Sequence, residues 1–316
     1  MKSRVALFGF VVLLLILGLM VNQHLRYMDA RLHAVQDYQA AFHGDVFHVL
    51  TFLKAREDQD FMMPLTDLVT AAKDTEGKLV YAGQVIYMGL RSEQITRTFG
   101  ASGEWQAILL QQFASREAYT AYLERPEIQT ATAEFAQTYA HGFERSAVLN
   151  VLLHQLFLAQ KIWRQITFHP DVLPFESAVP DDRQFQGASQ PLLQHANGLG
   201  REAILIVNLA RNGSEEQQAA NASYGAEMLG LMADLGYGPM HIGSTVSLEH
   251  DHEFDQAMLV YYPGSQYFHD LSTSTWFQGI IGDKQLADTQ ACITVPITNL
   301  LLKHSDESQN LGQQSL

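Results

Sequence analysis

The sequence predicts an α+β fold in which two similar units follow one apolar N-terminal helix. Three observations predict it. An apolar run without a charged residue fills positions 5–21. Residues 103–115 and 253–265 share one pattern, in which an acidic or aromatic start leads to Gln-Ala, an apolar run and a turn of small residues. Strand-like and helix-like segments also follow one another in the same order in both halves, which indicates an internal repeat.

The apolar run of residues 5–21 predicts a single transmembrane helix that anchors the chain in the cell membrane. Its 17 residues would span roughly 25 Å as a helix, close to the minimum for crossing a bilayer. Lys2 and Arg4 precede it, which favours a cytoplasmic N-terminus and a periplasmic location for the bulk of the protein. The residues that follow contain no small-x-small cleavage site, so an uncleaved anchor is favoured over a cleaved signal peptide. Residues 1–44 would form this anchor and a helical stalk.

The first unit is expected over residues 45–154. Segments rich in Val, Ile and Tyr predict strands, and apolar residues at three- and four-residue spacing predict helices. Gly77 provides a stop for the first helix. The expected elements are a strand at 46–55, a helix at 61–76, strands at 78–90 and 105–113, a helix at 115–139 broken near Pro126, and a strand at 146–153.

The second unit, over residues 201–300, repeats this order. Gly236 and Gly238 close its first helix. Both units are therefore predicted to have the βαββαβ order of ferredoxin-like folds. The expected elements are a strand at 203–210, a helix at 217–235, strands at 240–248 and 256–262, a helix at 265–281 and a strand at 291–297.

A connector at 155–200 and a tail at 301–316 complete the chain. The connector holds four of the nine prolines, and its apolar first part, 156–168, predicts a short helix. That helix could pack on the folded units or lie in a membrane interface, and packing is favoured because Lys161 and Arg164 are its only basic residues. The tail is polar and is predicted to be disordered.

The composition excludes several classes of protein. A net charge of −14 leaves no face that could neutralise phosphates, so a nucleic-acid partner is not expected. Cys292 is the only cysteine, which rules out an internal disulfide and a cysteine-based metal cluster. No Gly-x-Gly-x-x-Gly or phosphate loop is present, so no nucleotide cofactor is expected.

Polar residues at matching positions of the two units are the candidate ligand-binding residues. Asn208 is the only polar side chain in an apolar strand segment, and Thr51 aligns with it in the first unit. Tyr81 and His241 also align, each two residues before a glycine. Such residues could orient a ligand by hydrogen bonds in a shared cavity, or could simply be satisfied by neighbouring groups.

Two histidines close to the third strand of the second unit are weak candidates for a metal site. His250 and His252 alternate with acidic residues and could supply nitrogen and oxygen ligands. Residues two apart on a turn seldom converge on one ion, so a solvated acidic loop is the favoured interpretation.

Four segments resemble an uncharacterised family known as domain of unknown function 1330. They are Ala257-Met-Leu-Val-Tyr-Tyr-Pro-Gly-Ser with Asp255 before it, Gly77-Lys-Leu-Val-Tyr-Ala-Gly, Arg125-Pro-Glu-Ile-Gln and Phe143-Glu-Arg-Ser. The resemblance implies a dimeric α/β barrel, in which two ferredoxin-like sheets face each other around a cavity, here formed within one chain. It also implies an acidic residue at Asp255, whereas the first unit has Trp105 at the aligned position.

The superfamily that contains this family includes monooxygenases, haem-degrading and haem-binding enzymes, isomerases and proteins without known activity. The fold alone therefore transfers no reaction. Haem would require an axial ligand in an apolar cavity, for which His48, His141 and His241 are the candidates.

The expected function is binding of a small, largely apolar molecule in the barrel cavity, a setting that could support cofactor-independent oxidation or isomerisation. The predicted lining residues are Thr51, Tyr81, Asn208, His241 and Asp255. The alternative is a non-catalytic accessory or assembly subunit that contacts a membrane-protein partner through the stalk and the connector. An open space between the two sheets would favour binding, and a packed interior would oppose it.

Overall fold

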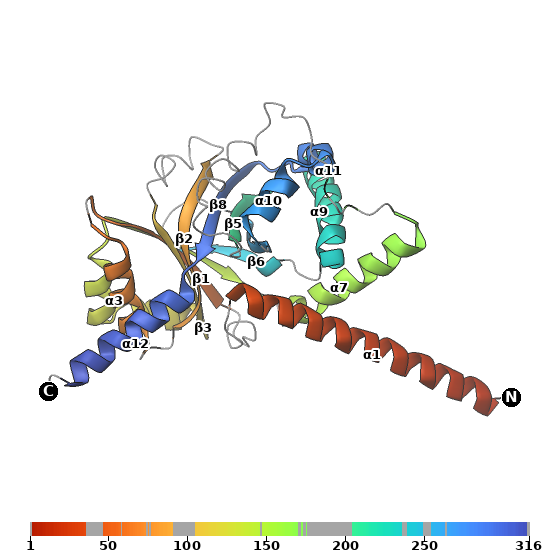
Figure 1. The fold of residues 1–316 in the computed structure, drawn as a ribbon, viewed down its shortest axis with the longest axis horizontal. Coiled ribbons are helices and arrows are strands. Elements are labelled where there is room, and N and C mark those ends of the chain that lie inside the picture. The colour runs from red at the N-terminus through yellow and green to blue at the C-terminus, as the bar shows by residue number, and fades with distance from the viewer. Residues whose placement is uncertain are drawn as a thin grey trace.

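The computed structural model shows two units with the same order of elements (Figure 1). It describes residues 2–35, 47–90, 105–169 and 204–314, except 58, 74, 76, 146, 236–238, 249–253 and 263, together with Val172 and Phe175. The first unit consists of β1 (Phe47–Lys54), α3 (Met62–Ala72), β2 (Lys78–Leu90), β3 (Ala107–Phe113), α5 (Arg116–Leu123), α6 (Pro126–Thr132) and β4 (Gln137–Glu144). The second consists of β5 (Ile204–Arg211), α9 (Glu215–Leu235), β6 (Pro239–Ser247), β7 (Gln256–Tyr262), α10 (Ser265–Ser272), α11 (Thr275–Ile280), η1 (Ile281–Asp283) and β8 (Asp288–Pro296).

The eight strands form one closed barrel in the order β1-β3-β2-β8-β5-β7-β6-β4. Each unit contributes four strands, and the units join at two seams, where β2 pairs with β8 and β4 pairs with β6. The predicted α+β class is confirmed, and the strands close into a barrel within one chain. Closure leaves no unpaired edge strand in the barrel.

The two halves also agree in strand register. Thr51 faces Leu109 across the β1–β3 pair, and Asn208 faces Met258 across the equivalent β5–β7 pair. Both second strands carry a register shift immediately before the candidate residue, between Leu79 and Tyr81 in β2 and between Pro239 and His241 in β6. The alignments of Thr51 with Asn208 and of Tyr81 with His241 therefore agree with the paired register.

One aligned pair needs correction. Because Leu109 and Met258 occupy equivalent positions, Trp105 corresponds to Phe254 rather than to Asp255. Both aromatic side chains are buried in the same core cluster, whereas Asp255 is exposed. In the sequence alignment, an offset of one residue paired Trp105, which faces inward, with Asp255, which faces outward.

The barrel interior is filled by side chains from both units. Among the largest buried side chains are Tyr81, Trp105, Tyr139 and Phe143, each at most 1% exposed. They pack with aliphatic residues of β5 and β7 in one continuous cluster. Where the structure describes it, the space between the two sheets is therefore occupied by side chains, and the described interior residues do not form the open cavity that would favour binding there. Interiors of this kind pack at nearly crystalline density.

A glycine permits close approach of the strands at one seam. A Cβ atom on Gly243 in β6 would overlap the carbonyl oxygen of Glu144 in β4. Any side chain at this position would push the two units apart, so the requirement for glycine here is steric.

Each unit is covered by helices, and a further helix follows each unit. These are α7 (Ala147–Ile166) and α12 (Thr298–Gln314). Helix α7 follows the first unit but packs on α9 of the second, and α12 follows the second unit but packs on α3 of the first. Leu301 of α12 is fully buried in the core cluster of the first unit, and Lys73 forms a 2.5 Å ion pair with Asp306. The two units are thus held together by exchanged helices as well as by the barrel.

Two predicted segments are wrong. The fourth strand of the first unit is β4 at 137–144, not 146–153, and residues 147–153 belong to α7. The tail expected to be disordered forms most of α12, whose buried Leu301 packs with the core of the first unit beneath α3.

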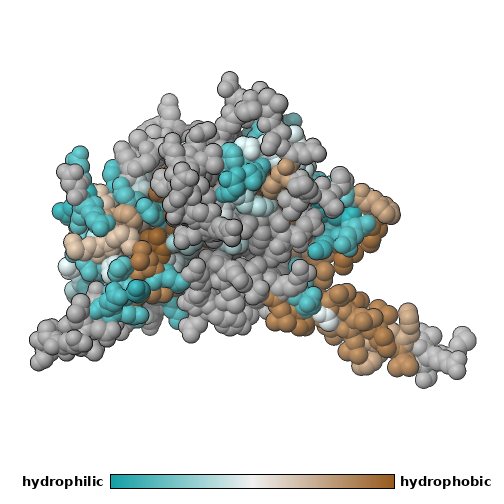
Figure 2. Space-filling view, in the orientation of Figure 1, coloured by the Kyte–Doolittle hydropathy of each residue, from teal (hydrophilic) through white to brown (hydrophobic). Residues whose placement is uncertain are grey.

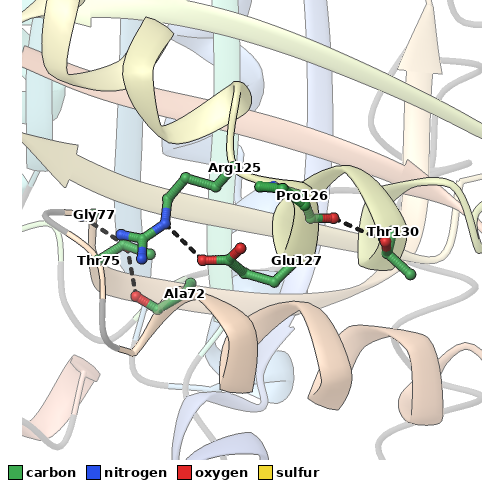
Figure 3. A network of polar contacts seen from close by, with 7 residues as sticks. All are labelled: Ala72, Thr75, Gly77, Arg125, Pro126, Glu127 and Thr130. Atoms are coloured by element: carbon green, nitrogen blue, oxygen red, sulfur yellow. Dashed lines mark hydrogen bonds and ion pairs between the residues drawn. The ribbon is translucent and has the colours of Figure 1, made fainter.

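The break expected near Pro126 separates α5 from α6 (Figure 3). Pro126 lies in the first turn of α6, where its missing N–H costs no hydrogen bond. Arg125, the N-cap residue, donates from Nε to Glu127 Oε1 at 2.7 Å. The Arg-Pro-Glu segment therefore turns the chain between two helices.

Helix α1 (Lys2–Val35) projects away from the barrel, with the N-terminus at its far end (Figure 1). Its described apolar side chains are mostly exposed, as shown by the brown surface in Figure 2. Within the part of the chain that the structure describes, no helix is both long and apolar enough to cross a membrane.

Packing of α12 on the first unit predicts a difference between two adjacent leucines. Leu301→Ala, at a fully buried site, should lower the free energy of unfolding by about 2–4 kcal/mol. Leu300→Ala, at a site 46% exposed, should change it by less than about 0.5 kcal/mol. Urea denaturation measures both values, and equal effects would contradict the packing of this helix.

Candidate functional site

The predicted ligand-binding residues divide between the two faces of the barrel wall. Tyr81 and His241 point into the filled interior, where both are buried. Thr51 and Asn208 lie on the opposite face, next to residues that pack against the helices. The structure therefore does not bring the five predicted residues together around one cavity.

Tyr81 is a structural residue of the interior. Its hydroxyl group lies 2.7 Å from Oγ1 of Thr294 in β8, across the seam between the units. Burial raises the pKa of Tyr81 above its ordinary value. Thr294 in turn donates to the backbone oxygen of Leu205, so the hydroxyl groups link β2, β8 and β5.

His241 belongs to a polar cluster at the other seam. Its Nδ1 lies 3.1 Å from Nη1 of Arg145, and both residues are buried. The ring of His241 also lies 5.2 Å from that of His48, which stacks on Phe143 at 5.1 Å. These contacts bring β1, β4 and β6 together.

Asp255 is exposed and does not border a cavity. Its Oδ2 accepts a hydrogen bond from the backbone N–H of Asn212 at 2.6 Å. Its own N–H donates to the carbonyl oxygen of Ala210 at 2.8 Å. These bonds join the end of β5 to the start of β7, which is a structural role.

The site that the structure offers is a pocket on the outer face of the second unit, between the barrel wall and α9, α10 and α11. Its volume is about 300 Å³. Strands β5, β7 and β8 form its floor, and the buried Met228, Met232 and Phe277 lie among its helical walls. The polar side chains Asn221, Gln256 and Lys284 are only partly buried. Apolar pockets with a few polar groups are typical small-molecule sites.

Asn208 is the buried polar residue of this pocket. It is 8% exposed and lies on the floor between Met258 of β7 and Ala291 of β8. Its Oδ1 atom is buried and has no hydrogen-bond partner among the described residues. A buried acceptor without a partner costs about 1–3 kcal/mol. Asn208 thus directs an unused acceptor into an apolar pocket.

A substitution between the units contributes to the pocket of the second unit at this position. Ala210 occupies the position of Leu53, since Leu53 pairs with Ala107 as Ala210 pairs with Gln256. Leu53 is buried under the helices of the first unit. The smaller Ala210 and the glycine at 225 in α9 instead line the pocket.

The three candidate haem ligands do not fit a haem site. His48, His141 and His241 are buried in the barrel interior, where His141 packs edge-on against Phe254 at 5.4 Å. The pocket of the second unit has no histidine among its lining residues. The described residues therefore bring none of the three candidate haem ligands to this pocket.

The weak metal candidates His250 and His252 lie outside the described residues. Within the described ranges, no group of three or more His, Cys, Asp or Glu side chains could hold a metal ion.

The pocket residues other than Asn208 were missed from the sequence. One signal was available, which is the size difference between Leu53 and Ala210 at matched positions.

The sequence matches no protein-family model and none of the curated proteins. The fold is similar to several solved structures. For a chlorite dismutase from Candidatus Nitrospira defluvii in complex with imidazole, the TM-score is 0.42 at 8% identity, over 84% of this chain and 98% of that chain. For a putative monooxygenase from Fusobacterium nucleatum subsp. nucleatum, it is 0.41 at 7% identity, over 80% and 94%. For a dye-decolorizing protein from V. cholerae, it is 0.41 at 12% identity, over 84% and 98%.

These similarities are too weak to assign the chain to a family or to transfer an activity. The resemblance to domain of unknown function 1330 stays a prediction.

Burial of Tyr81 predicts a loss of stability at alkaline pH. Its folded-state pKa is raised, so its contribution is complete below the unfolded pKa of about 10 and is lost above it. The loss is about 1.4 kcal/mol per pH unit for one group. Tyr81→Phe should reduce the slope of unfolding free energy against pH by that amount. Thr294→Val, which removes the same hydrogen bond but keeps the phenol, should retain the wild-type slope. Equal slopes in all three proteins would contradict the prediction.

The unused acceptor of Asn208 predicts that its removal stabilises the ligand-free protein. Asn208→Leu should raise the free energy of unfolding by about 1 kcal/mol, because a buried polar group without a partner is replaced by an apolar one. Thr51→Val at the matched position should have a smaller effect. Thermal unfolding measures both, and a destabilised Asn208→Leu protein would show that the amide is satisfied.

Proposed function

We propose that the protein binds a small, largely apolar molecule in the pocket between the barrel wall and α9, with Asn208 as its hydrogen-bond partner. The observation that supports this most directly is the buried Oδ1 atom of Asn208, which has no partner among the described residues and lies on an otherwise apolar floor. A hydroxyl or N–H group of the ligand would satisfy it and offset the cost of its burial.

The distribution of polar residues suggests the shape of the ligand. Met228, Met232 and Phe277 are buried, so the inner wall favours an apolar body. Lys284 and Asn221 are more exposed, so a polar or anionic end fits near the solvent side. The polarizable methionine side chains adapt to varied ligand shapes.

The described lining residues support binding more than catalysis. They include no carboxylate and no imidazole that could act as a general base. Burial raises the pKa of Tyr262 well above its ordinary value, so this phenol stays protonated near neutral pH. Oxidation or isomerisation would need a reactive group supplied by the ligand itself.

We also infer that residues 5–21 anchor the chain in the cell membrane, with the N-terminus in the cytoplasm and the barrel in the periplasm. The support is the uncharged apolar run, whose described side chains are largely exposed on α1. Transfer of these side chains into lipid would remove a large apolar surface from water.

Native mass spectrometry of the full-length protein, purified from its own host, tests the binding proposal. The wild-type protein should carry a non-covalent small-molecule adduct. Ala291→Leu should abolish the adduct because the added side chain fills the floor beside Asn208. Asn208→Leu should weaken retention about tenfold, corresponding to one lost hydrogen bond.

Thr51→Val is the matched control, since Thr51 occupies the equivalent position in the first unit and does not line the pocket. Its adduct should be unchanged. An adduct that persists in Ala291→Leu would place the ligand elsewhere, and a wild-type protein without any adduct would argue against binding.

A further inference from the structure

One face of α7 is apolar and exposed. Its residues recur at alternating steps of four and three, which places them on one side of a helix. Trp163 is 62% exposed, Ile166 is 64% exposed, and Phe168, just beyond the helix, is 92% exposed. The α7 apolar face comprises Leu152, Leu156, Ala159, Trp163 and Ile166, which follow these steps, together with Phe168 just beyond the helix.

The opposite side of α7 already supplies the contacts that fix the helix to the fold. Phe157 is fully buried in the core of the second unit. Arg164 is 6% exposed, packs close to Gly230 and lies 3.8 Å from Glu227 of α9. The apolar face is therefore not needed to hold α7 in place, and its exposure is not a consequence of loose packing.

The end of α7 uses phenylalanine where helices usually end with glycine. Phe168 has φ of 52°, in the left-handed region. The N–H of His169 donates to the carbonyl oxygen of Arg164, as in a Schellman motif. A bulky residue in this conformation costs free energy relative to glycine. Phe168 thus places a large apolar side chain, 92% exposed, at the end of the apolar face.

Helix α7 adjoins the apolar segment of α1. Gln155 Nε2 donates to the carbonyl oxygen of Met20 at 3.2 Å, near the end of the apolar run. Figure 1 shows both helices projecting from the same side of the barrel, and Figure 2 shows hydrophobic surface on α1 and along one edge of α7. The α7 apolar face therefore lies on the helix that contacts α1 at the end of its apolar run, the segment that would contact lipid if α1 is a membrane anchor.

The charge of α7 also fits a lipid surface. Its twenty residues contain Lys161 and Arg164 but no Asp or Glu, in a chain of net charge −14. Lys161 is partly exposed but lies on the side of the helix away from the apolar face, and Arg164 is buried against α9, so the apolar face itself carries no charged residue. An acidic protein that approaches anionic phospholipids must keep carboxylates away from the contact, and this helix does so.

We propose that the α7 apolar face lies in the membrane interface and inserts Trp163, Ile166 and Phe168 at the boundary between headgroups and acyl chains. Tryptophan favours this boundary because its ring is apolar and its N–H is polar. The inference rests on the proposed anchoring of residues 5–21 and adds a second, independent attachment point. Since α7 packs on α9, which lines the pocket, the contact holds the pocket beside the bilayer, where apolar molecules concentrate.

Tryptophan fluorescence of the full-length protein in phosphatidylcholine–phosphatidylglycerol vesicles tests the proposal. Trp105 is buried in the barrel and Trp276 is partly buried, so Trp163 is the most exposed of the three indoles. Brominated phospholipids should quench the wild-type emission at least twofold more than that of Trp163→Phe. Aqueous acrylamide should quench the two proteins to a similar extent.

Vesicle flotation, measured on the same samples, separates this inference from the anchor. A protein that floats but whose Trp163 is quenched by acrylamide and not by brominated lipid overturns the α7 contact and leaves the anchor standing. A protein that floats with Trp163 shielded from both quenchers also overturns it, because a protein surface then covers this face. A protein that does not float overturns the anchor, and with it the inference.

A second variant excludes misfolding as an explanation. Ile166→Ser with Phe168→Ser removes exposed side chains only, so the melting temperature should stay within a few degrees of wild type. Emission of Trp163 in this variant should be quenched less by brominated lipid and more by acrylamide. Unchanged quenching would overturn the proposed insertion.

Discussion

Closure of the barrel at two seams is the constraint on which the rest of the structure depends. A four-stranded half-barrel has two edge strands whose backbone groups must be paired, and each unit satisfies the edges of the other. Pairing of β2 with β8 and of β4 with β6 requires close approach, which Gly243 permits. The buried Tyr81–Thr294 and Arg145–His241 contacts lie across these seams. Polar residues that resemble a binding site in the sequence therefore serve to join the units.

A filled interior restricts where a ligand can bind. Since the described residues of both sheets face the same packed core, the described pockets lie between the barrel wall and the helices, about 300 Å³ in the second unit and about 210 Å³ in the first. There the units are free to differ, because neither seam depends on the size of these side chains. Leu53 fills the space in the first unit, and Ala210 opens it in the second. Asn208 therefore lies on the floor of the second-unit pocket, whereas its counterpart Thr51 does not line that pocket.

The sequence was sufficient for the order of elements but not for the faces of the strands. Apolar runs such as β5 are buried on both sides, so alternation does not reveal that Asn208 faces outward while Leu209 faces inward. The start of α7 is an apolar, partly β-branched segment that could equally be a buried strand, which displaced the fourth strand from 137–144. Helix α12 was missed because Leu301 gains its burial from α3, more than two hundred residues away in the chain.

The exchanged helices link the pocket to the surface of the molecule. Helix α12 covers α3 with a buried leucine and an ion pair, and exposes mainly polar side chains. Helix α7 covers α9 in the corresponding way, yet its outward face carries Trp163 and Ile166. Packing of α7 on α9 and of α12 on α3 requires an apolar inner face on each helix, but it places no requirement on their outer faces. The packing of the barrel therefore does not account for the difference in their outer faces, whereas the proposed membrane contact of α7 does. Because α9 both packs against α7 and lines the pocket, the proposed membrane contact of α7 would lie next to the unit that has space for a ligand.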